Sequence, residues 1–80
     1  MFETINDYVT RRNQWNALFG EKTELNVYKK ADRCTIAEML QNELSPENLS
    51  CDGELSYAQI KTRKMYLEKA LYELQWMDSL

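Results

Sequence analysis

The segment from Ser56 to about Met77 constrains the fold most, because it predicts one long, uninterrupted amphipathic α-helix. It contains neither Gly nor Pro, the two residues that most often end a helix. Ser56-Tyr57-Ala58-Gln59 has the pattern of a capping box, and Leu55 with Ile60 completes a hydrophobic staple around it. The apolar residues that follow at helical spacing form one stripe: Ile60, Leu67, Leu71 and Leu74.

The length of this helix matters as much as its pattern. About 22 residues at a rise of 1.5 Å give roughly 33 Å of helix. That is longer than either of the other predicted helices can cover alone. We therefore expect one end to project from the domain or to pack on another chain.

A second helix is predicted from about Thr4 to Phe19. Ile5, Tyr8, Trp15 and Phe19 recur at spacings near the helical repeat. Gly20 follows directly and suits the left-handed position that commonly ends a helix.

The stretch from Glu21 to Arg33 allows two interpretations. Leu25, Val27 and Tyr28 could form a short strand or one to two helical turns. A lone strand would have no partner elsewhere in the chain and would be poorly stable. Irregular or partly helical structure is therefore favoured here.

Two helix starts are predicted in the middle of the chain. Thr35-Ile36-Ala37-Glu38 has the form of a capping box, with Cys34 and Met39 as its staple, and predicts a helix to about Leu44 that buries Ile36 and Leu40. Ser45-Pro46-Glu47 predicts a further short turn that sets Leu49 against the core. Cys51-Asp52-Gly53-Glu54 is then expected to be a turn.

These elements predict a single all-α domain over residues 1–80, with three main helices and a long C-terminal amphipathic helix. Only two Gly and one Pro argue against an all-β architecture with many tight turns. Two Trp, five Tyr and two Phe supply enough apolar area to argue against disorder. A core of this size yields only about 3–5 kcal/mol, so a helical dimer stays an open alternative.

Much catalytic chemistry is excluded by composition. The chain has no histidine, which removes the commonest general base and metal ligand, and two cysteines cannot supply a structural zinc site. Its two glycines stand apart, so there is no phosphate-binding loop. Glu43, Glu47, Asp52 and Glu54 lack the spacing of a calcium loop and are interpreted as a solvated acidic loop. We expect no enzymatic activity, no cofactor and no metal.

The compartment is expected to be the cytoplasm. The net charge of −3 identifies no partner, and no apolar run approaches the length of a membrane span. The first residues lack the features of a signal peptide. In a reducing compartment Cys34 and Cys51 are expected to be thiols, with Cys34 acting as a small apolar residue.

Aromatic residues provide the candidates for protein binding. Tyr72 and Trp76, four positions apart, project from a different side of the predicted C-terminal helix than its apolar stripe. Exposed aromatic pairs of this kind are enriched at protein–protein contacts. Tyr66 and Met77 border the stripe and complete the candidate set on this helix. For Trp15 a place in the core is favoured, with interface contact as the alternative.

Basic residues provide a nucleic-acid alternative. Lys61, Arg63 and Lys64 lie in the first half of the C-terminal helix, which follows a short helix as in a helix-turn-helix. The long connection between the two helices and its acidic residues count against this reading. A solvated face of mixed charge is favoured for these residues. The pairs Lys64–Glu68 and Lys69–Glu73 are expected to contribute little beyond solubility.

The function favoured by these residues is non-enzymatic binding of a protein partner, of itself, or of both, through the C-terminal helix. A compact chain without catalytic groups suits an inhibitor, an adaptor or a regulatory subunit. Small helical proteins of this type are common among phage and mobile-element products. The alternative is a small nucleic-acid-binding regulator.

Overall fold

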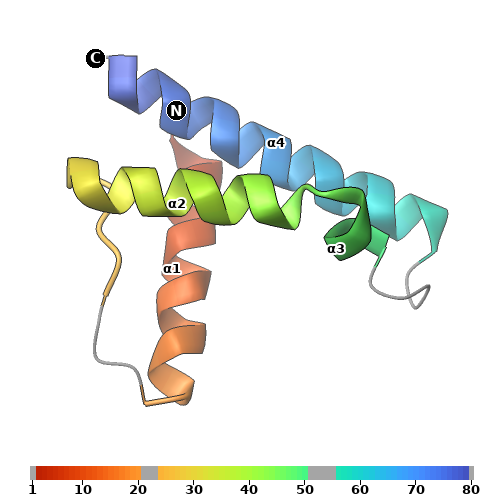
Figure 1. Ribbon diagram of the computed structural model, residues 1–80, viewed down its shortest axis with the longest axis horizontal. Helices are drawn as coiled ribbons and strands as arrows, with labels where there is room; N and C mark the ends of the chain where they lie inside the picture. Colours follow the sequence, from red (N-terminus) through yellow and green to blue (C-terminus); the bar gives the residue numbers. More distant parts are fainter. Residues whose placement is uncertain (1, 21–23, 51–55, 80) are drawn as a thin grey trace.

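The computed structural model describes residues 2–20, 24–50 and 56–79 of the chain (Figure 1). They form four helices, α1 (Glu3–Leu18), α2 (Lys30–Glu43), α3 (Pro46–Ser50) and α4 (Tyr57–Ser79). No strand occurs in these described ranges, so the all-α prediction is confirmed. The expected turn at 51–54 and the staple residue Leu55 lie outside the described residues.

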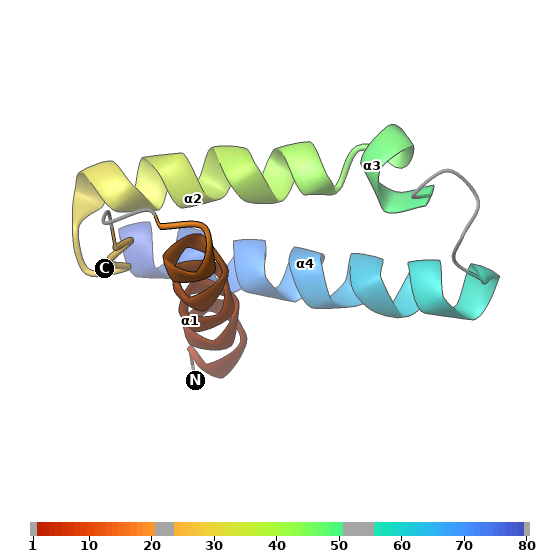
Figure 2. The ribbon, with the colours of Figure 1, turned by 90° about the horizontal axis from the view of Figure 1, so that it is seen from below.

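An antiparallel pair of helices, α2 and α4, forms the body of the domain (Figure 2). Ile36 and Leu40 of α2 are fully buried, as predicted, and they face the buried Leu67 and Leu74 of α4 in one core cluster. The short helix α3 continues along α4 beyond the end of α2 and buries Leu49. Together α2 and α3 follow α4 for most of its length, which neither could do alone.

The capping prediction for α4 is confirmed atom by atom. The Gln59 backbone N–H donates to Ser56 Oγ at 3.3 Å, and Gln59 Oε1 accepts from the Ser56 backbone N–H at 2.9 Å. This reciprocal pair satisfies two of the donors that a helix N-terminus leaves free. It fixes where α4 begins, one residue after Ser56.

Helix α1 crosses the α2–α4 pair steeply and packs on α4 (Figures 1 and 2). Its buried residues, Ile5, Tyr8 and Val9, all lie in its first half. Gly20 follows it with φ of 78°, in the left-handed region, and its N–H donates to the carbonyl of Ala17. The predicted helix over 4–19 and its glycine end are therefore confirmed within one residue.

The N-terminus of α1 is capped from α4. Its own N-cap residue, Phe2, makes no side-chain capping bond. Instead Glu73 Oε1 accepts the backbone N–H groups of Thr4 at 3.0 Å and Ile5 at 3.1 Å. Glu73 is only 3% exposed, so the interpretation of Lys69–Glu73 as a solvated pair was wrong. A carboxylate at this position also meets the positive end of the helix dipole.

The prediction that α2 begins at Thr35 was wrong, because α2 begins at Lys30. Asn26 starts a turn, with its Oδ1 accepting the N–H of Tyr28, and Asp32 Oδ2 accepts the N–H of Asn26. Thr35 therefore lies inside α2, where its Oγ1 donates to the Ala31 carbonyl at 3.3 Å. Residues 24–29 before it are irregular and then form a turn, as favoured for this region, and they bury Val27. Residues 21–23 lie outside the described residues.

The expected burial of Trp15 was also wrong. Trp15 is 56% exposed, and its neighbours Leu18 and Phe19 are more exposed still. The cause is the crossing geometry, because the second half of α1 extends beyond the surface of α2 and α4 (Figure 1). Trp15 packs instead on Phe19, with ring centroids 4.9 Å apart. The helical periodicity of the apolar residues continues past the point where the helices touch.

Candidate protein-binding surface

Large apolar side chains lie exposed along one side of α4. Tyr57 is 82% exposed, Met65 61%, Tyr72 67% and Trp76 40%. Lys61 and Glu68 lie among them and are exposed as well. We call these six residues the outer face of α4. It lies away from the stripe of Leu67, Ala70 and Leu74 that the core buries.

Trp76 stands at the end of the outer face and is partly supported. Its ring meets Phe2 edge to face, with centroids 5.7 Å apart. This contact connects the outer face to the start of α1. Tyr72, one turn earlier, has no such ring contact in the described part of the chain.

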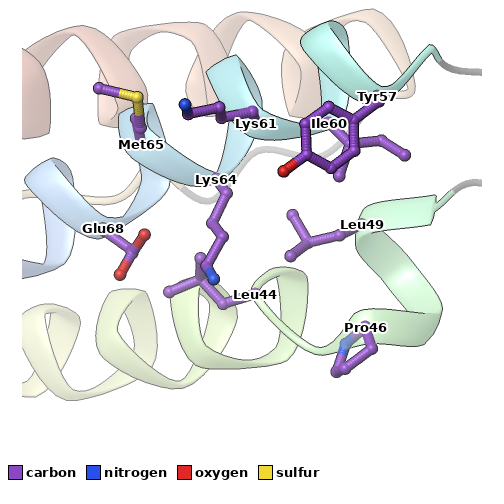
Figure 3. Close-up of a pocket in the computed structure, with 9 residues that line it drawn as sticks. All are labelled: Leu44, Pro46, Leu49, Tyr57, Ile60, Lys61, Lys64, Met65 and Glu68. Atoms are coloured by element: carbon purple, nitrogen blue, oxygen red, sulfur yellow. The ribbon is translucent and has the colours of Figure 1, made fainter.

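A groove runs beside the first half of the outer face, between α4 and the α2–α3 segment (Figure 3). It has a volume of about 550 Å³. Leu44, Leu49 and Ile60 contribute apolar side chains to its lining. Four residues belong both to the groove and to the outer face, so the two surfaces are continuous: Tyr57, Lys61, Met65 and Glu68. Lys64 extends from α4 toward the α2–α3 side of the groove.

Tyr66 and Met77, which were predicted to bind a partner, face the inside of the fold. Both are half-buried and pack against the core cluster. The Tyr66 hydroxyl donates to Asp7 Oδ2 on α1 at 2.7 Å, and Arg11 pairs with the same carboxylate at 3.0 Å. The hydrogen bond from Tyr66, assisted by Arg11, lowers the pKa of Asp7. Burial and the Asp7 carboxylate raise the pKa of Tyr66 above its ordinary value. Tyr66 therefore joins α1 to α4.

A second tyrosine makes a similar connection between α1 and α2. The Tyr8 hydroxyl donates to Glu43 Oε2, and burial together with this carboxylate raises the pKa of Tyr8. Glu43 Oε1 also lies 3.7 Å from Arg63 Nη2 on α4. Glu43 thus ends α2 at a point where three helices meet, and its interpretation as part of a solvated acidic loop was wrong.

The three candidate nucleic-acid residues do not share one surface. Lys61 and Lys64 line the groove beside the outer face. Arg63 is half-buried on the other side of α4, where it pairs with Glu43. The arrangement separates one of the three charges from the other two.

Trp15 lies apart from the outer face. It lines a hollow of about 260 Å³ in the angle between α1 and α4, together with Tyr8, Arg12 and Leu67. The predicted protein-binding set is therefore divided over three places: the outer face, the side of α4 that packs on the core, and this angle.

Two further site predictions can be compared with the structure. Cys34 is a free thiol on the surface, so its expected role as a small apolar residue was wrong, while Cys51 lies outside the described residues. Across the described positions, no group of three or more Cys, Asp or Glu side chains could hold a metal ion. In the same positions no helix is both long and apolar enough to cross a membrane.

Two residues of the outer face, Tyr57 and Met65, were missed as binding candidates. Tyr57 is the most exposed large apolar residue of α4. Met65 lies seven positions before Tyr72, a spacing that returns to the same side of a helix after about two turns. That spacing was the available signal.

Comparison with known proteins adds no relative. No protein-family model, no curated protein and no solved structure matches the chain.

Proposed function

We propose that this chain is a non-enzymatic interaction module that binds a polypeptide through the outer face of α4. A single exposed apolar residue is ordinary on a protein surface. Here four large ones occupy one side of one helix, and the least exposed of them still shows 40% of its surface. This accumulation is the observation that carries the proposal, since large exposed apolar patches mark interaction sites.

The composition of the face supports the same function. Tyrosine and tryptophan are the side chains most enriched among residues that dominate binding energy, and methionine adapts readily to a partner's surface. Tyr72 and Met65 contribute to no buried cluster of the fold, so stability does not account for them. Binding of a partner would remove these apolar side chains from water.

A substitution series tests this function. Tyr72→Ala and Met65→Ala should leave the fold intact, because both side chains are exposed. Each should weaken binding by tenfold or more, because losing one such contact costs about 1.4 kcal/mol of binding free energy, which is a tenfold change in Kd. Tyr28→Ala is the matched control, because Tyr28 is 74% exposed but belongs to the turn before α2 and not to α4. The readout is retention of a bound polypeptide, including the chain's own copies, by immobilised variants.

The proposal is supported by a polypeptide that the wild type and Tyr28→Ala retain and that Tyr72→Ala and Met65→Ala lose. It is overturned if all four proteins retain the same polypeptides equally. Circular dichroism of each variant confirms that any loss is not due to unfolding.

Nucleic-acid binding is not favoured by the geometry. Arg63, the middle residue of the proposed basic set, is paired with Glu43 on the side of α4 opposite the outer face. Phosphate binding draws on basic side chains presented together. Lys61 and Lys64 alone, beside Glu68, form a weak basic patch.

A further inference from the structure

Four of the six residues of the outer face of α4 form a pattern that is symmetric about its own centre. Tyr57 is followed after four residues by Lys61, and Glu68 is followed after four residues by Tyr72. At about 100° per residue these four side chains lie within an arc of about 60° on the helix. Their midpoint falls between Lys64 and Met65.

This symmetry makes the face complementary to itself when two copies of α4 run antiparallel. A twofold axis through the midpoint places Lys61 opposite Glu68 of the second copy, and Tyr57 opposite Tyr72 of the second copy. The charge pairs then lie about 5 Å along the helix from the axis and the tyrosine pairs about 11 Å from it. A twofold axis repeats each contact, so two ion pairs and two aromatic pairs form at once.

Charge selects this alignment over its neighbours. A parallel alignment in register would set Lys61 on Lys61 and Glu68 on Glu68, which is repulsive. An antiparallel shift of one turn in one direction puts Lys61 opposite Tyr72. The opposite shift puts Lys61 opposite Lys64. Only the symmetric register pairs both charges and both tyrosines.

The side chains needed for this pairing are available. Tyr57, Lys61, Glu68 and Tyr72 are all exposed. Within the described part of the chain neither Lys61 nor Glu68 takes part in an ion pair. Lys64 extends into the groove toward α2 and α3, which leaves Met65 nearest to the axis (Figure 3).

We propose that the polypeptide bound by the outer face of α4 is a second copy of this chain, paired antiparallel through Lys61–Glu68 and Tyr57–Tyr72 contacts. This inference rests on the proposed function and names its partner. One helix pair buries an area near the low end of specific interfaces, below about 1,200 Å². The dimer should therefore dissociate in the micromolar range or above.

Charge reversal tests the register. The mass in solution is measured by sedimentation equilibrium from micromolar to millimolar concentration for the wild type, Lys61→Glu, Glu68→Lys and the double variant. The wild type should approach twice the 9.5 kDa of one chain. Each single reversal should weaken association by about tenfold or more, because it opposes like charges twice. The double variant restores both pairs and should return to within about threefold of the wild type.

Matched reversals at exposed sites of α2, Lys30→Glu and Glu38→Lys, should leave the mass curve unchanged. The proposal is overturned if the wild type remains a monomer up to millimolar concentration, or if the double variant associates no better than the single reversals. The first result leaves the proposed function standing when Tyr72→Ala still abolishes binding of another polypeptide. Equal retention by all the alanine variants removes the proposed function itself.

Discussion

Glu73 is the residue whose replacement tests the packing of this fold most sharply. In Glu73→Ala the backbone N–H groups of Thr4 and Ile5 lose their acceptor at 3.0 and 3.1 Å. A buried donor left without a partner costs about 1–3 kcal/mol, and losing a helix cap costs about 1 kcal/mol. Thr4 is half-buried, so water can replace part of its bond. We expect a loss of about 2–3 kcal/mol in the free energy of unfolding.

The conservative variant separates the hydrogen bond from the charge. Glu73→Gln retains a carbonyl oxygen for the same two donors but loses the negative charge at the helix N-terminus. It should therefore cost only about 1 kcal/mol, the scale of a charge at a helix end. Urea unfolding followed by circular dichroism measures the stability of both variants. In thermal unfolding the melting temperature should fall by about 4–8 °C for each kcal/mol of stability lost.

Glu38→Ala on the exposed side of α2 serves as the control and should stay within about 0.5 kcal/mol of the wild type. If Glu73→Ala is as stable as this control, the capping of α1 from α4 contributes nothing. If Glu73→Gln is as unstable as Glu73→Ala, the contribution comes from charge and not from the two hydrogen bonds.

Three further predictions concern α1. Folding raises the pKa of Tyr8 and Tyr66 above the ordinary value of about 10, so both hydroxyls contribute fully to stability below about pH 10, and this contribution is lost as the pH rises from there toward the raised pKa. The melting temperature should therefore begin to fall between about pH 9 and 11, and Tyr8→Phe should make the fall smaller. An equal fall in both proteins would refute the role of Tyr8. Gly20→Ala should lower the free energy of unfolding in urea by about 1 kcal/mol through backbone strain alone, because nothing lies within 4 Å of the added Cβ. An unchanged free energy of unfolding would mean that the left-handed turn is not populated. Trp15→Ala should cost less than about 1 kcal/mol, and a loss of about 3–5 kcal/mol would show that Trp15 is buried.

Local signals in the sequence predicted much of the fold. Three helix ends could be predicted because their signals act within a few residues of the chain: the capping box at Ser56, the glycine after α1 and the Ser-Pro start of α3. The start of α2 was mispredicted because two local signals competed. The contacts of Asn26 and Asp32 extend the helix backward, and Thr35 tolerates a place inside it.

Features that depend on how helices meet could not be predicted. The periodicity of α1 contains no information on its crossing angle with α4, which decides that Tyr8 is buried and Trp15 is not. The burial of Glu73 depends on where α1 begins in space, far away in the sequence. The site was predicted in part, because Tyr72 and Trp76 fall off the apolar stripe whatever α4 packs against, whereas Tyr66 bonds to Asp7 only in the folded chain.

Photo-crosslinking from single positions tests the central claim, that the outer face of α4 is the binding surface, most directly. Benzoylphenylalanine is placed at Tyr72 or, as a control, at Tyr28, since both tyrosines are exposed to a similar degree. After irradiation at millimolar protein and in cell extract, the probe at Tyr72 should give a crosslinked product and the probe at Tyr28 should not. Products from Tyr28 alone, or from neither position, would contradict the claim.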